Sequence, residues 1–140
     1  MKVLLAVDGS EWSETAVRAV ISQIRPQATE VLVVQIVDTR MVSTPPSWSQ
    51  PTSPLTEARE SVARAAEILK SAGLPVSTRV IEGEARSGIL DTAAEWRAEM
   101  IVLGSHGRTG LRRFALGSVA ETVARHAHCS VMIVRAPPVP

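Results

Sequence analysis

Short apolar runs and longer amphipathic segments alternate along the chain. Five runs rich in Val, Ile and Leu predict β-strands, and they are Val3–Val7, Val31–Val37, Val76–Ile81, Met100–Leu103 and Val131–Val134. Four of them are almost continuously hydrophobic, which is typical of parallel strands buried on both faces. The third run alternates apolar and polar residues, so it predicts a strand with one partly open face at the edge of a sheet.

Between the apolar runs, four segments repeat apolar residues at helical spacing. They predict helices over Trp12–Ile24, Thr56–Ala72, Ala85–Arg97 and from Gly117 to near His126. Ser10 is placed to cap the first helix, and Gly73 is a stop signal for the second. Ser118 and Glu121 predict a capping box at the start of the fourth.

This βαβαβαβαβ order predicts one α/β domain, residues 1–140, with a doubly wound five-stranded parallel sheet and helices on both faces. In such sheets a ligand lies outside the carboxyl ends of the strands, where the strand order reverses. The first strand ends in Asp8-Gly9-Ser10, and the fourth runs into Gly104-Ser105-His106-Gly107. If these strands are neighbours, the order is 3-2-1-4-5. The proline-rich stretch Asp38–Leu55 is expected to be a surface loop.

Composition narrows the classes of function. The formal net charge of the 140 residues is +1, so we expect no broad basic field and no nucleic-acid partner. No apolar run approaches the ~20 residues of a membrane span, and the one near Met1 is too short for a signal-peptide core; no membrane association is expected. The one cysteine, Cys129, cannot form an internal disulfide. We therefore expect a cytoplasmic protein in a reducing compartment.

The glycine-rich stretch after the fourth run is the strongest local pattern. Gly104, Gly107, Gly117 and Ser118 have the spacing G-x2-G-x9-G-S between a buried strand and a helix start. Glycine lets backbone amides approach an anion without a Cβ in the way. The following helix N-terminus adds N–H donors and a positive dipole end, and Arg108 adds positive charge. The stretch predicts a polyphosphate site that is not a P-loop, since the chain has no Gly-Lys-Ser/Thr.

The pattern resembles the universal stress protein family, in its ATP-binding branch, over essentially the whole chain. The resemblance rests on residues 2–10, 34–38, 104–110, 116–121 and 129–134. It implies that ATP, which we expect together with Mg²⁺, binds at the strand ends. The implied contacts are Ala6, Val7 and Ile36 for adenine, Asp8 for ribose, Leu103, Gly104, His106 and Gly107 for ribose and phosphate, and Gly117, Ser118 and Val119 for phosphate.

These residues also have plain structural interpretations. Gly117 and Ser118 can serve only as a helix start, and Asp8 can be a turn residue in Asp-Gly. His106 sits inside the glycine loop, which favours a nucleotide contact without implying catalysis. Cys129 and the two histidines before it lack a second ligand cluster, so we expect no resident metal site.

The function itself stays open among three interpretations. The resemblance favours a regulatory ATP-binding protein of the stress response over a dedicated enzyme. A slow ATPase or phosphotransferase is the second interpretation, although no constellation that positions a nucleophile is evident. A nucleotide-free interaction module of the same fold is the third. Because the last run is apolar throughout and lies at a sheet edge in the order 3-2-1-4-5, we also expect a homodimer through Val131–Arg135.

Overall fold

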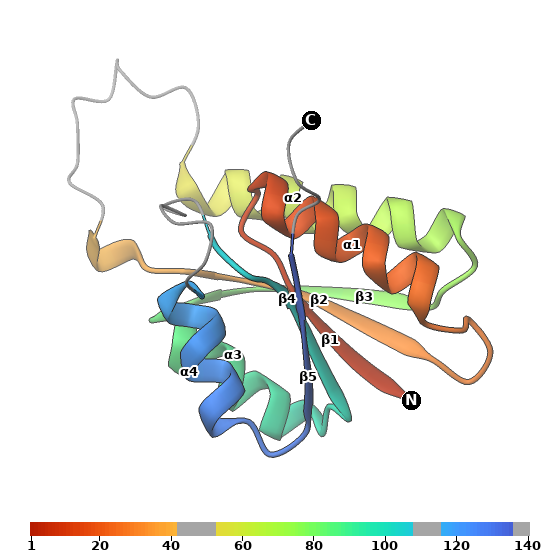
Figure 1. The fold of residues 1–140 in the computed structure, drawn as a ribbon. Coiled ribbons are helices and arrows are strands. Elements are labelled where there is room, and N and C mark those ends of the chain that lie inside the picture. Colours follow the sequence, from red (N-terminus) through yellow and green to blue (C-terminus); the bar gives the residue numbers. More distant parts are fainter. Residues whose placement is uncertain (42–52, 108–115, 136–140) are drawn as a thin grey trace, which may run out of the picture.

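The computed structural model describes residues 1–41, 53–107 and 116–135. Within them, strands and helices alternate along the chain as expected (Figure 1). The strands are β1 (Lys2–Ala6), β2 (Glu30–Val37), β3 (Val76–Glu82), β4 (Met100–Gly104) and β5 (Ser130–Val134). The helices are α1 (Glu11–Gln23), α2 (Pro54–Ser71), α3 (Ala85–Trp96) and α4 (Ser118–His126), with a short 3-10 helix, η1, over Thr39–Met41.

The strands form one parallel sheet in the order β3-β2-β1-β4-β5, which confirms the predicted topology. In register, Val3 of β1 stands beside Val31 of β2 and Met100 of β4. β3 and β5 form the two edges, and most β3 side chains are exposed or half-exposed. The order of the strands across the sheet reverses between β1 and β4: β2 and β3 lie on one side of β1, and β4 and β5 lie on the other. A ligand is therefore expected at the carboxyl ends of β1 and β4.

Helices cover both faces of the sheet, with α1 and α2 on one side and α3 and α4 on the other (Figure 1). Successive side chains of a strand point to opposite faces. Leu5 therefore packs with Val20 of α1 and Leu69 of α2, whereas Leu4 packs with Val123 of α4. All five are fully buried, and each such side chain contributes about 1.5–3 kcal/mol to folding. This two-sided core holds the strand ends in place.

Two helix ends form as the local sequence predicts. The Ser10 hydroxyl accepts a hydrogen bond from the backbone N–H of Ser13 at 3.3 Å and caps α1. Gly73 follows α2 with a φ of +92°, a conformation that favours glycine. α2 begins at Pro54, inside the stretch expected to be a loop, because proline suits the first turn of a helix. Residues 42–52 of that stretch lie outside the described residues.

The start of α4 differs from the prediction. Gly117 is the N-cap residue, Ser118 is already helical, and no side chain caps this end. Glu121 instead pairs with Arg125 one turn later, with 3.0 Å between the charged atoms. The predicted capping box was therefore wrong. Because glycine has no side-chain acceptor, the first N–H groups of α4 remain open to another partner.

Candidate functional site

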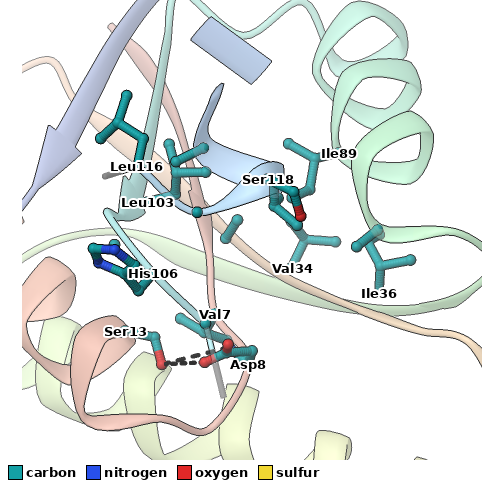
Figure 2. A pocket seen from close by; sticks show the side chains of 17 residues that line it. Val7, Asp8, Ser13, Val34, Ile36, Ile89, Leu103, His106, Leu116 and Ser118 are labelled. Carbon is teal, nitrogen blue, oxygen red and sulfur yellow. Dashed lines mark hydrogen bonds between the residues drawn. The ribbon is translucent and has the colours of Figure 1, made fainter. Parts of the chain in front are cut away.

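A cavity of about 350 Å³ lies at the carboxyl ends of β1, β2 and β4, beside the N-termini of α3 and α4 (Figure 2). Its volume is in the range of small-molecule sites, about 300–1,000 Å³. The lining residues are Ala6, Val7, Asp8, Ser13, Val34, Ile36, Ala85, Ile89, Leu103, Gly104, His106, Gly107, Leu116, Gly117, Ser118, Val119 and Ala120. Every residue that the sequence assigned to the site lies on this cavity except Arg108, which lies outside the described residues.

One end of the cavity is apolar. Ala6 and Val34 are neighbours in register across β1 and β2, and Ile36 lies two residues further along β2. Ala85 and Ile89 of α3 close this end from above the sheet. Ile36 was predicted, but Val34 and the two α3 residues were missed. The alternation of strand side chains places Val34 on the same face as Ile36 and could have identified it.

Asp8 lies where β1 leaves the sheet, and its carboxylate is held in place. Its Oδ1 accepts hydrogen bonds from the Ser10 N–H at 2.9 Å and from the Ser13 hydroxyl at 3.2 Å, the latter drawn in Figure 2. Gly9 makes the turn with a φ of +81°. The other oxygen, Oδ2, faces Gly107, where an added Cβ would lie 2.8 Å from it. Asp8 is thus both a turn residue and a fixed acceptor on the cavity wall.

Packing contacts within the protein explain why glycine stands at these positions of the motif at least as directly as the close approach of an anion to the backbone would. A Cβ on Gly104 would lie 2.9 Å from the backbone oxygen and the Cβ of Trp12 in α1. A Cβ on Gly117 would lie 3.1 Å from the carbonyl oxygen of Ser105, to which the Gly117 N–H donates at 2.8 Å. Neither glycine has a positive φ. Gly117 therefore shapes the loop, and its N–H is already used.

The next N–H groups point to an anion site at the start of α4. The first backbone bond of this helix runs from the Glu121 N–H to the Gly117 carbonyl at 3.0 Å. Within the described residues, the N–H groups of Ser118, Val119 and Ala120 have no acceptor. All three residues line the cavity, and the positive end of the helix dipole adds to the attraction for an anion.

His106 connects the glycine loop to α1. Its ring centroid lies 4.8 Å from that of Trp12 at an interplanar angle of 48°. Nδ1 lies 3.1 Å from the Ser105 hydroxyl. The residue is only 9% exposed, and its Nε2 has no partner in the described part of the chain. Trp12 is therefore a packing residue, and it fixes the position of a polar ring on the cavity wall.

The family model of the universal stress protein family matches residues 1–135. The chain belongs to the universal stress protein family. A universal stress protein of Methanocaldococcus jannaschii is 33% identical over 140 residues, which cover 97% of this chain and 82% of that protein. The family assignment made from the sequence is thereby confirmed.

Solved structures show the same fold. The hypothetical protein MJ0577 superposes with a TM-score of 0.83 at 26% identity, covering 99% of this chain and 97% of its own. The universal stress protein of Archaeoglobus fulgidus in complex with dAMP has a TM-score of 0.71 at 26% identity, covering 96% and 97%. Two further neighbours, at 17% and 22% identity, were solved with AMP and with cAMP. At those identities they show the fold alone.

Two findings limit the chemistry of this universal stress protein. In the ranges 1–41, 53–107 and 116–135, no group of three or more His, Cys, Asp or Glu side chains could hold a metal ion. Asp8 is the one carboxylate among the cavity-lining residues of those ranges.

None of the described helices is both long enough and apolar enough to cross a bilayer.

Proposed function

We propose that this universal stress protein binds ATP in the cavity and acts as a regulatory protein of the stress response rather than as a dedicated enzyme. One observation carries the proposal: an apolar end, a fixed carboxylate and a set of unpaired helix amides line a single cavity. An apolar base, ribose hydroxyls and phosphate are the three matching parts of a nucleotide. We place the protein in the cytoplasm, where the free Cys129 suits a reducing medium.

Each part of the nucleotide has a matching surface. Adenine would pack at the apolar end against Ala6, Val34 and Ile36, and the dAMP complex of the Archaeoglobus fulgidus relative supports an adenine nucleotide. The ribose hydroxyls would donate to Asp8. The phosphates would accept hydrogen bonds from the open N–H groups of Ser118 and its successors, a common anion site at a helix N-terminus.

We propose that Mg²⁺ reaches this site on the triphosphate. Protein sites for nucleotide-bound Mg²⁺ usually contribute one or two carboxylates, and phosphates and water complete the coordination. The described cavity offers one carboxylate, Asp8, and its Oδ1 already accepts two hydrogen bonds. The site thus fits a metal held mainly by phosphate oxygens, where it would neutralise phosphate charge.

Regulation is favoured over turnover by the same residues. Phosphoryl transfer needs a group that orients the nucleophile and a charge clamp on the transferred phosphoryl group. Among the described cavity residues, Asp8 is engaged by Ser10 and Ser13, and His106 packs against Trp12. Slow hydrolysis remains the alternative, and the experiment below measures it.

The test begins with the nucleotide that copurifies with the protein, identified after denaturation, and continues with titration calorimetry of ATP, GTP and UTP with Mg²⁺. We expect ATP to bind most tightly and to remain intact over hours. A folded protein without measurable affinity for ATP at millimolar concentration would overturn the proposal. Steady release of ADP would instead establish the ATPase.

We further propose a homodimer through the edge strand β5. Val131–Val134 are apolar and only half-buried, and the outer edge of the strand has no neighbour in the described sheet. Such edges are normally covered. The Val134 carbonyl accepts from the Ser105 N–H on the β4 side. Because backbone groups alternate sides along a strand, Ile133 directs its N–H toward the open edge, whereas Met132 directs its N–H toward β4.

An Ile133→Pro variant should therefore become a folded monomer, since proline removes a donor from the open edge only. Analytical ultracentrifugation at micromolar concentration measures the change. Met132→Pro is the matched control, because it removes a donor to β4 and should destabilise the sheet itself. Sedimentation of the unmodified protein as a monomer would contradict the dimer, and a folded dimeric Ile133→Pro variant would contradict this interface.

A further inference from the structure

α3 carries a glycine in its first turn, at Gly88, where helix propensity favours almost any other residue. Glycine within a helix costs about 1 kcal/mol relative to alanine. Gly88 has no positive φ that would require glycine. A contact gives the reason: a Cβ on Gly88 would lie 2.9 Å from both Cδ1 and Cγ2 of Ile36, and 3.0 Å from its Cγ1. The missing side chain leaves room for Ile36.

Ile36 cannot make room by turning its end away. All three outer carbons of the side chain approach Gly88, and a β-branched residue has a stiff χ1. Ile81 stands beside it in register on β3 and packs in the same apolar cluster. The open space next to Ile36 is the cavity, whose wall it forms beside α3 (Figure 2). A Cβ on Gly88 would therefore drive Ile36 into the cavity.

We propose that Gly88 determines the size of the base that the cavity accepts. By letting Ile36 lie against α3, it keeps the apolar end deep enough for the two rings of a purine. The inference rests on the proposed function, because it concerns the same cavity. Gly88 does not line the cavity itself, so it is a positioning residue that acts through Ile36.

The expected size of the effect follows from the chemistry of apolar pockets. One methylene group more or less in such a pocket changes discrimination by about 10- to 200-fold. A Cβ on Gly88 displaces a whole side chain toward the base. The sugar and phosphate contacts at Asp8 and Ser118 come from the turn after β1 and from α4, so they should be unaffected.

The experiment compares ATP with UTP, which share the sugar and the triphosphate and differ in the base. Titration calorimetry on Gly88→Ala should show ATP affinity reduced by about tenfold or more, with UTP affinity changed much less. The ratio of the two affinities should fall accordingly. Asp91→Ala is the matched control, since Asp91 is exposed in the same helix, and it should leave the ratio unchanged. Gly88→Ala should fold, because alanine favours the helix.

A double-mutant cycle with Ile36→Ala separates the proposed mechanism from a general disturbance of α3. Once Ile36 is truncated, adding Gly88→Ala should cost no further ATP affinity. Equal losses in both backgrounds, or an unchanged ratio in folded Gly88→Ala, would overturn the role of Gly88 while ATP binding by the unmodified protein stands. An unmodified protein that binds neither nucleotide would overturn the proposed function, and this assignment with it.

Discussion

Replacing Ser118 with proline should weaken ATP binding while leaving the fold intact. Ser118 is the first residue of α4, and its N–H has no acceptor in the described structure. Proline is well tolerated at this helix position because the missing N–H makes no intrahelical bond. Gly117 has φ −63° and ψ 157°, the extended region that a residue before proline adopts. The substitution thus removes the N–H donor and the hydroxyl of Ser118 while keeping the start of the helix.

The magnitude follows from the kind of hydrogen bond that is lost. A hydrogen bond to a charged group contributes about 1.5–3 kcal/mol, and each ~1.4 kcal/mol corresponds to a factor of ten in affinity. ATP affinity should therefore fall by roughly 10- to 150-fold. The free energy of unfolding should change by no more than about 0.5 kcal/mol, as for other surface substitutions.

Titration calorimetry with ATP and with adenosine measures the effect, because adenosine lacks the phosphates and should bind both proteins equally. Ser118→Ala is the matched control: it removes the hydroxyl, keeps the N–H and should retain most of the ATP affinity. A folded Ser118→Pro variant with the ATP affinity of the unmodified protein would refute the anion site at α4. Equal losses for ATP and adenosine would show that the base end had been disturbed instead.

Two further predictions concern carboxylates. Asp8→Asn keeps an acceptor at Oδ1 but replaces the Oδ2 that faces Gly107. The difference in affinity between ATP and its 2′-deoxy and 3′-deoxy analogues, measured by calorimetry, should therefore shrink. A variant that keeps the full difference would exclude Asp8 from the ribose site. The Ser87 N–H and then the Arg86 side chain lower the pKa of Glu84 from the ordinary 4.5 to about 2. Its contribution to stability is therefore complete above pH 4.5 and is lost as the pH falls toward 2. The Glu84→Gln variant should have a lower Tm than the unmodified protein at neutral pH, and its Tm should fall less as the pH drops from 4.5 to about 2. Parallel curves of Tm against pH for the two proteins would contradict this.

Much of the fold could be predicted because it depends on interactions between residues close in sequence. Apolar runs marked the strands, and the Ser10 cap and the Gly73 stop involve partners within a few residues. The strand order followed from chemistry at two strand ends, which must face each other to form one site. The residues of the proposed phosphate site could also be located from the sequence, because the glycine spacing and the start of α4 lie in one stretch of chain.

The predicted capping box failed because a contact between distant residues decided where α4 begins. Ser118 and Glu121 have the right local spacing, but the Gly117 N–H bonds to the Ser105 carbonyl twelve positions earlier. That bond is accompanied by an extended conformation at Gly117, which makes it the N-cap. Local pattern and loop closure compete here, and loop closure prevails.

The elements, their order and the glycine loop could be predicted from the chain alone, since they depend on periodicity and on neighbours along the chain. The structural role of the glycines became visible only once the elements were packed together. Gly104 admits Trp12, and Gly88 admits Ile36. Tertiary packing also brings Val34 of β2 and Ile89 of α3 to one apolar wall of the cavity. A close approach between segments distant in sequence depends on how whole elements pack, and no pattern within one segment records that distance.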